Sequence, residues 1–132
     1  MVGNYTHSID SKSRMSLPSK LRKKLGDTVY LAKVFDDCIT VYSEDGWALF
    51  MDKIKDKPRS FRFGVNDSAI ECDIDAQGRV VLPAKLREYA ALENEAVISG
   101  QNTHVEIWNP ARHAEKLAAY QEYDAGDIQE EL

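Results

Sequence analysis

The chain has 132 residues, which suits one ordinary domain or two very small ones. Its longest apolar runs are too short to span a bilayer, and its N-terminus lacks the basic-then-apolar pattern of a secretory signal. Cys38 and Cys72 are two lone cysteines in a chain with no export signal. We therefore expect a reduced cytoplasmic protein in which both thiols are small core residues.

The net charge of −5 conceals an uneven distribution of charge along the chain. Residues 1–25 contain six basic residues and one acidic residue, whereas residues 113–132 contain six acidic residues and one basic residue. Net acidity alone argues against a nucleic-acid partner. The distribution matters more than the total, because a basic surface can attract a polyanion even on an acidic protein.

One segment of the sequence occurs twice, at a constant offset of 65 residues. Residues 9–22 and 74–87 share Ile, Asp, Arg, Leu, Pro, Lys, Leu and Arg at equivalent positions. Such a repeat indicates that one small unit is used twice. A unit of this size would bury little apolar surface alone, so we expect one core built by both halves.

The first half reads as strands and helices in a simple order. Alternation predicts a strand over 2–9, a polar turn over 10–13 and a second strand over 14–17, which together form a hairpin. A short helix begins at Pro18 and ends at Gly26. Strands over 28–34 and 38–42 follow. A longer helix then carries an apolar stripe of Trp47, Phe50, Met51 and Ile54, ends at Pro58, and leaves 57–66 to join the two halves.

The second half repeats this order. It has a hairpin of strands near 70–74 and 79–82, a helix from Pro83 to about residue 91, and strands over 96–99 and 104–108. Asn109 caps a final helix that turns Ala114, Leu117 and Ala118 inward. From Asp124 onward the acidic chain is expected to be disordered.

The architecture is thus a ββαββα unit written twice, which predicts a small, mostly β barrel shared between the units. We place the first repeat at residues 4–46 and the second at 69–112. Residues 113–132 form the C-terminal helix and acidic tail.

The two repeated turns begin with Asp10 and Asp75, and aspartate favours such turns because its carboxylate accepts bonds from N–H groups further on. Gly78 can adopt a positive φ without steric cost. Ser13 holds the equivalent position and can do so only with difficulty. This difference leaves open another shape for the first turn.

The sequence offers little for catalysis. The turn explains Asp10 and Asp75 without an acid–base role. The three histidines and two cysteines lack the paired spacing of a zinc site, and there is no phosphate loop, nucleophile elbow or HExxH motif. We expect neither an enzyme nor a metal, cofactor, small-molecule substrate or membrane partner.

A nucleic-acid interface remains. Arg14 follows a turn at a hairpin edge, near Lys12, Lys20 and Lys24. Arginine on a rigid scaffold can grip a phosphate or bind guanine O6 and N7 together, and lysines suit phosphate contacts. The alternative is a solvated basic face with Arg14 paired to Asp10.

At these residues the chain resembles the MraZ family of bacterial transcriptional regulators, within the AbrB-like swapped-hairpin group. The resemblance is carried by residues 10–14 with Leu17-Pro18, and by residues 75–79 with 82–90. It implies an AbrB-like double-split β-barrel, an intramolecular form of the swapped-hairpin dimer, and chains assembled into a ring. It further implies a nucleoid-associated protein that binds direct repeats in double-stranded DNA upstream of its own operon, in the division and cell-wall gene cluster, and represses it.

The resemblance places Lys12 and Arg14 on the DNA-contact motif and Arg79 on its second copy. Nearby basic residues complete the expected DNA-binding set, which is Lys12, Arg14, Lys20, Arg22, Lys24 and Arg79. The family motif usually reads Asp-x-Lys-Gly-Arg, whereas this chain has Ser13 in the first copy and Gln77 in the second. We therefore predict that the first unit contacts DNA and the second mainly builds structure. The competing hypothesis is an antitoxin-like protein-interaction module that uses the acidic tail and the Trp47 helix.

Overall fold

The computed structural model describes residues 1–121 and 126–132, which form eight strands and six helices within that part of the chain. The strands are β1 Asn4–Ser8, β2 Arg14–Ser16, β3 Thr28–Ala32, β4 Ile39–Ser43, β5 Ile70–Asp73, β6 Arg79–Val81, β7 Glu95–Gly100 and β8 Val105–Trp108. The helices are α1 Ser19–Leu25, α2 Glu44–Lys53, α3 Arg59–Ser68, α4 Ala84–Tyr89, α5 Pro110–Gln121 and α6 Gly126–Glu131. None of these helices is long and apolar enough to cross a membrane.

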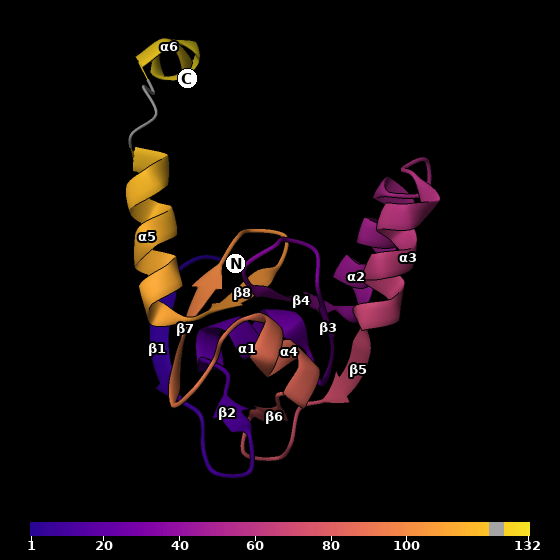
Figure 1. Cartoon of the computed structure of the whole chain (residues 1–132), viewed down its shortest axis with the longest axis vertical. Coiled ribbons are helices and arrows are strands. Elements are labelled where there is room, and N and C mark those ends of the chain that lie inside the picture. Colours follow the sequence, from indigo (N-terminus) through magenta and orange to yellow (C-terminus); the bar gives the residue numbers. More distant parts are fainter. Residues whose placement is uncertain (122–125) are drawn as a thin grey trace.

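The strands form one large sheet and one small ladder (Figure 1). Six strands pair in the order β1-β7-β8-β4-β3-β5, and β2 pairs with β6 in a separate two-stranded ribbon. Every pairing is antiparallel. The prediction of a mixed fold built from two repeated units is confirmed, although the described residues form more helix than strand. The ladders themselves describe an open sheet, with β1 and β5 at its two edges.

Strands of one unit pair with strands of the other. The first unit's β1 and β2 lie against the second unit's β7 and β6, and β3 pairs with β5. The predicted hairpin of residues 2–17 is therefore wrong as a ladder, because β1 and β2 are not paired and an isolated bridge between Ile9 and Met15 takes the place of a ladder. Alternation shows which side chains face the core but not which strand lies alongside.

The units are related by an approximate two-fold axis. Exchanging the units leaves the sheet order unchanged, since β1 corresponds to β5, β3 to β7 and β4 to β8. The centre of the ribbon is the equivalent pair Met15 and Val80, and the centre of the β4–β8 ladder is Thr40 opposite Glu106. The repeat in sequence is thus a symmetric pair in space.

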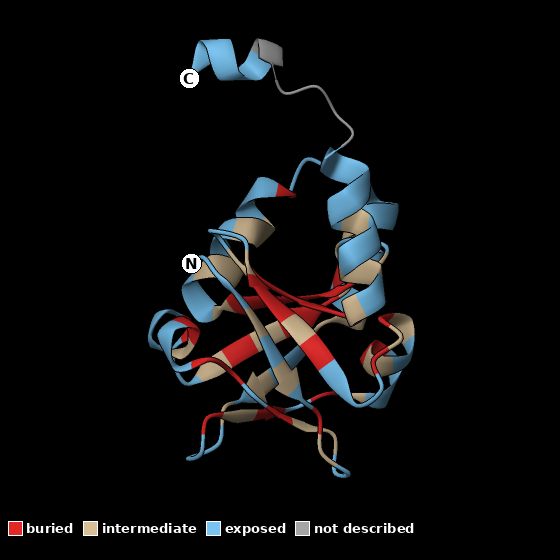
Figure 2. Ribbon diagram, turned by 90° about the vertical axis from the view of Figure 1, so that its left-hand side faces the viewer, coloured by how far each residue is buried: buried red, intermediate tan, exposed pale blue. Residues whose placement is uncertain are grey.

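A single core lies between the large sheet, the ribbon and the two short helices α1 and α4 (Figure 2). Both units contribute to it, so neither has a separate core. Cys38 is fully buried, whereas Cys72 is half-buried and packs against the core. The fully or almost fully buried side chains include Met15, Leu21, Leu25, Val29, Leu31, Ile39, Val80, Leu82, Leu86, Ile98 and Ile107.

The aromatic stripe of α2 packs on the outer side of the sheet. Trp47 stacks on Tyr30 with ring centroids 5.3 Å apart, and Phe50 stacks on Tyr42 at 4.9 Å. Trp47, Phe50 and Met51 are half-buried, and Ile54, which follows the last residue of α2, is buried at 6% exposure. The assignment of the stripe to packing is confirmed.

The joining segment is a helix, α3, and not an irregular linker. Pro58 was predicted to end the first long helix, but α2 already ends at Lys53, and Pro58 is the N-cap of α3. Proline is compatible with a helix start because the first N–H groups have no intrahelical partner. Val65 of α3 is buried, and the Ser68 hydroxyl accepts a bond from the backbone N–H of Lys33.

The C-terminal helix departs from the prediction. Asn109 caps α5 as expected, since its Oδ1 accepts the backbone N–H of Arg112. Ala114, Leu117 and Ala118 are exposed and not inward-facing, because α5 runs past the edge of the sheet (Figure 1). The expected disorder from Asp124 is wrong for 126–131, which form α6, while Asp124 and Ala125 lie outside the described residues.

Candidate nucleic-acid interface

The first repeated turn is built around the carboxylate of Asp10. Its Oδ1 accepts the backbone N–H groups of Lys12 and Arg14, each at 2.9 Å. Its Oδ2 accepts Arg14 Nε at 2.7 Å. The Asp10 carbonyl also accepts the N–H of Ser13. One carboxylate therefore fixes both the path of the backbone and the side chain of Arg14.

The second turn has the same construction. Asp75 Oδ1 accepts the N–H groups of Gln77 and Arg79 at 2.9 Å each, and Oδ2 accepts Arg79 Nε at 2.9 Å. The backbone conformation is similar at the two equivalent positions, since Ser13 adopts φ 62° and Gly78 adopts φ 79°. The first turn thus has the shape of the second although it lacks the glycine.

These bonds shift the acidity of both aspartates. The hydrogen bond from the Arg14 backbone N–H, helped by the Arg14 side chain and the Lys12 N–H, holds the pKa of Asp10 below its ordinary value although burial opposes the shift. The pKa of Asp75 is lowered by the equivalent contacts from Arg79 and Gln77. Both carboxylates are therefore ionised at neutral pH, and each remains an acceptor for its arginine.

The two arginines lie on the outward face of the β2–β6 ribbon. Met15 and Val80 point into the core, so their neighbours along each strand point away from it. Arg14 lies opposite Val81, and Arg79 lies opposite Ser16, which places both arginines on one face. The turns project from the end of the molecule opposite α2, α3 and α5 in both ribbon views (Figures 1 and 2).

Each arginine keeps donor groups for a ligand. Arg14 and Arg79 bind their aspartates through Nε. Within the described part of the chain, their terminal nitrogens have no hydrogen-bond partner. The side chains of Arg14 and Arg79 are 32% and 27% exposed. The pairing of Arg14 with Asp10, considered above as an alternative to ligand binding, is present, but it orients the guanidinium and does not consume it.

The predicted lysines are not all gathered at the turns. Lys12 is exposed on the first turn, and Lys20 is exposed in the first turn of α1. Lys24 lies at the other end of α1, where it lines a shallow depression together with Asp27 and Glu44. Lys12 and Arg14 thus lie at the first turn, and Arg79 lies on the same face of the ribbon as Arg14, whereas Lys24 belongs to a mixed-charge surface.

Arg22 is placed differently from the other predicted site residues. It is half-buried on α1, and its guanidinium lies against the second unit's turn, where a Cβ atom added to Gly78 would be 1.5 Å from Nη1. Arg87, its equivalent in the repeat, was missed as a site residue. The repeat itself marked both positions, because Arg22 and Arg87 match at the 65-residue offset.

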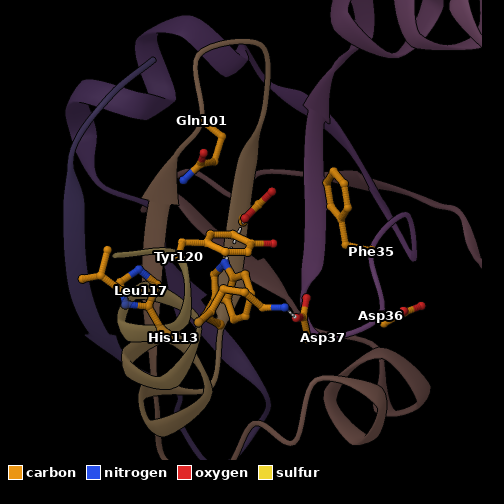
Figure 3. A pocket seen from close by; sticks show the side chains of 10 residues that line it. Phe35, Asp36, Asp37, Gln101, His113, Leu117 and Tyr120 are labelled. Carbon is orange, nitrogen blue, oxygen red and sulfur yellow. Dashed lines mark hydrogen bonds and ion pairs between the residues drawn. The ribbon is translucent and has the colours of Figure 1, made fainter. Parts of the chain in front are cut away.

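A hollow of about 430 Å³ lies elsewhere, between α5 and the β3–β4 loop (Figure 3). Asp37 forms an ion pair with Lys116 there at 2.7 Å. Glu106 in its wall accepts bonds from Trp108 Nε1 and His104 Nε2. Asp37, Lys116 and Glu106 are thus already paired, and the hollow does not touch the two turns.

The described residues also contain no group of three or more histidine, cysteine, aspartate and glutamate side chains placed to hold a metal ion. Cys38 lies in the core, where burial raises the pKa of its thiol far above the ordinary value. The distinctive chemistry of the described surface is therefore the pair of matched arginine turns.

Comparison with known proteins gives a consistent result. A family model described as "MraZ protein, putative antitoxin-like" matches residues 1–62 and 67–131. A protein of Alkaliphilus oremlandii named Transcriptional regulator MraZ is 43% identical over 114 residues, which cover 82% of this chain and 80% of that protein. Proteins of the same name from Alkaliphilus metalliredigens and Caldicellulosiruptor saccharolyticus are 44% identical over 114 residues and 39% identical over 124 residues. These two alignments cover 82% and 89% of this chain, and 80% and 87% of the two relatives. The chain therefore belongs to the MraZ family.

Proposed function

We propose that this chain is a DNA-binding transcriptional regulator that reads double-stranded DNA with the outward face of the β2–β6 ribbon and its two turns. One observation carries the proposal, namely two arginines held in the same way by two aspartates on one exposed face. The names of the relatives, Transcriptional regulator MraZ, support it.

The geometry suits a DNA groove. The major groove of B-DNA admits a two-stranded β-ribbon, and arginine can bind guanine O6 and N7 with two donors. Arg14 and Arg79 have two terminal nitrogens each for such contacts, because their aspartates engage Nε. Lys12 and Lys20, both exposed, would bind phosphates and position the ribbon.

We propose that the two turns contribute unequally. The first turn carries Lys12 beside Arg14, whereas the second has the neutral Gln77 beside Arg79. Attraction to phosphate is therefore stronger at the first turn. Arg14→Ala is expected to weaken DNA binding more than Arg79→Ala in two folded proteins, and equal losses would contradict this asymmetry.

The finer features of the proposal rest on the family resemblance. They are binding to direct repeats upstream of the chain's own operon, repression of that operon, and a cytoplasmic, nucleoid-associated location.

We also propose that the open sheet and the ribbon together form the swapped-hairpin barrel. The cross-unit pairs β1–β7 and β2–β6 support it, with the Ile9–Met15 bridge between them.

The test of the function is DNA binding over a range of salt concentrations. The duplex comes from upstream of the gene, with a shuffled duplex as competitor. Wild-type protein should bind selectively, with affinity falling steeply as salt rises. Arg14→Ala should lose about ten- to hundredfold in affinity. The control is Arg59→Ala, an exposed arginine on α3 at the other end of the molecule, which should bind as wild type. Absence of selective binding by folded wild-type protein would overturn the proposal.

We also propose that the chain assembles into a homo-oligomeric ring. Large apolar side chains are exposed on helices away from the turns, among them Leu49 at 67%, Phe63 at 57% and Leu117 at 51%. Such surfaces mark interaction sites when they gather together. Analytical ultracentrifugation should give an oligomer that Phe63→Glu weakens. A wild-type monomer at micromolar concentration would contradict the assembly.

The same exposed side chains favour one alternative, a protein-interaction module that masks another protein. The wording "antitoxin-like" of the family description supports it. Affinity purification distinguishes the protein-interaction module from the DNA-binding regulator. A stoichiometric protein partner with no retained DNA would favour the module, whereas retained DNA with only copies of this chain favours the regulator.

A further inference from the structure

Each unit has an arginine on its short helix that reaches the turn of the other unit. Arg87 on α4 donates Nη1–H to the hydroxyl of Ser13 at 2.8 Å. Its equivalent, Arg22 on α1, lies directly over Gly78. Ser13 and Gly78 are themselves equivalent, so each turn is touched by the other unit's arginine at the same position.

Arg87 also connects the first turn to the second unit's backbone. Its Nη2 donates to the carbonyl of Glu93 and, at 3.5 Å, to that of Leu92. The next carbonyl along the chain, that of Asn94, accepts the N–H of Ile9 at 2.8 Å. The segment after α4 thus holds the residue that precedes the turn, while Arg87 holds the residue near its end.

A third contact closes this arrangement. The carbonyl of Ser13 accepts the N–H of Leu82 at 2.8 Å, so the second unit binds both the main chain and the side chain of Ser13. Ser13 adopts φ 62°, a conformation that side chains other than glycine rarely adopt. External contacts of this kind can hold a residue in such a conformation.

We propose that Arg87 is a positioning residue that holds the Asp10–Arg14 turn of the first unit in its DNA-binding shape. This inference rests on the proposed function, and it makes the first unit's DNA site dependent on the second unit. Arg87 is half-buried, and both of its terminal nitrogens donate to groups within the chain, so it orders the turn without contacting DNA. Arg22 takes the corresponding place over the second turn.

The first test needs no DNA. Hydrogen exchange of the full chain, followed by mass spectrometry on peptides spanning 9–17 and 74–82, measures how tightly each turn is held. Arg87→Met should speed exchange in the first peptide by about tenfold, because a charge-assisted bond is lost, and affect the second much less, since there only the Leu82 N–H is bonded to Ser13. The control is Arg112→Met, which removes another arginine-to-carbonyl bond, to Tyr89, without touching the turn. Unchanged exchange in both peptides would overturn the proposal.

The second test separates positioning from direct contact. Arg87→Met should weaken DNA binding by about tenfold with the salt dependence unchanged, since counterion release counts only phosphate contacts. Lys12→Met should weaken binding and reduce the slope of log K against log salt by about 0.9. An equal reduction of the slope by Arg87→Met would show that Arg87 contacts DNA and would overturn the proposal.

A double-mutant cycle tests the contact itself. Ser13→Ala removes the acceptor and keeps the Cβ restriction, so it should reproduce much of the Arg87→Met effect, and the two changes together should not add. Additive losses would overturn the proposal. If Arg87→Met does not fold, Ser13→Ala replaces it in the exchange experiment with the same expected result. If wild-type protein binds no DNA, the proposed function fails, whereas hydrogen exchange still decides the positioning role.

Discussion

At the scale of single residues, the interface depends on an aspartate that serves two purposes. Asp10 accepts two backbone N–H groups and the Nε of Arg14, and Asp75 does the same for Arg79. The sequence predicted both aspartates as turn residues and Arg14 as a ligand-binding residue. It did not show that the same carboxylate performs both tasks, because that depends on the direction of side chains in three dimensions.

Acid should loosen both turns. The folded pKa values of Asp10 and Asp75 lie below their unfolded values, so these groups contribute stability above about pH 4 that is lost as pH falls through their folded pKa values. Urea unfolding between pH 7 and pH 2.5 should show a shallower acid loss for the double variant Asp10→Asn, Asp75→Asn than for wild type. Identical pH profiles would show that these carboxylates do not contribute.

Two glycines should respond to alanine in opposite ways. Gly78 has φ 79° and lies under Arg22, so Gly78→Ala should destabilise the fold by about 1–2 kcal/mol. Gly64 lies inside α3 with no atom within 4 Å of an added Cβ, so Gly64→Ala should stabilise it by about 0.5–1 kcal/mol. Thermal unfolding measures both, and a stable Gly78→Ala would contradict the strained turn.

At the scale of elements, the sequence predicted most strands and helices but not their partners. Alternation located β1 and β2 correctly, yet β1 pairs with β7 and β2 with β6. Because both units carry the same pattern, each strand has an equally suitable partner in its own unit and in the other. The helix α3 was missed because Pro58 was interpreted only as a stop, although it also caps the next helix.

The ribbon's central pair should dominate its stability. Met15 is fully buried opposite Val80, so Met15→Ala should cost about 2–5 kcal/mol through lost packing and the cavity left behind. Val81→Ala is a control on the same ribbon, since Val81 is 57% exposed, and it should change stability by less than about 0.5 kcal/mol. Equal effects in urea unfolding would show that the ribbon is not anchored through this pair.

At the scale of the whole molecule, two units form one structure around a shared core. The repeat and the small size of each unit predicted this sharing, and the family resemblance predicted the exchange of strands. The predicted inward face of α5 was wrong. Ala114, Leu117 and Ala118 have the helical spacing typical of a buried face, but they extend beyond the sheet and are exposed. Spacing identifies a face of a helix, whereas the length of the sheet decides how much of it is covered.

One unit alone should not fold as a monomer. A fragment of residues 1–68 loses the partners of β1, β2 and one edge of β3. We expect no cooperative unfolding transition from the monomeric fragment, and any folded fraction should sediment as a dimer. A folded monomer with a cooperative transition would contradict the shared core.

The central claim is that DNA lies on the β2–β6 ribbon and its turns. Hydrogen exchange of the full chain with and without a duplex from upstream of its gene tests this most directly, because it covers all surfaces at once. We predict that DNA slows exchange in peptides spanning 10–16, and less strongly in those spanning 75–81, with α2 and α3 unchanged. Slowed exchange over α2 and α3 with both turns unchanged would contradict the account.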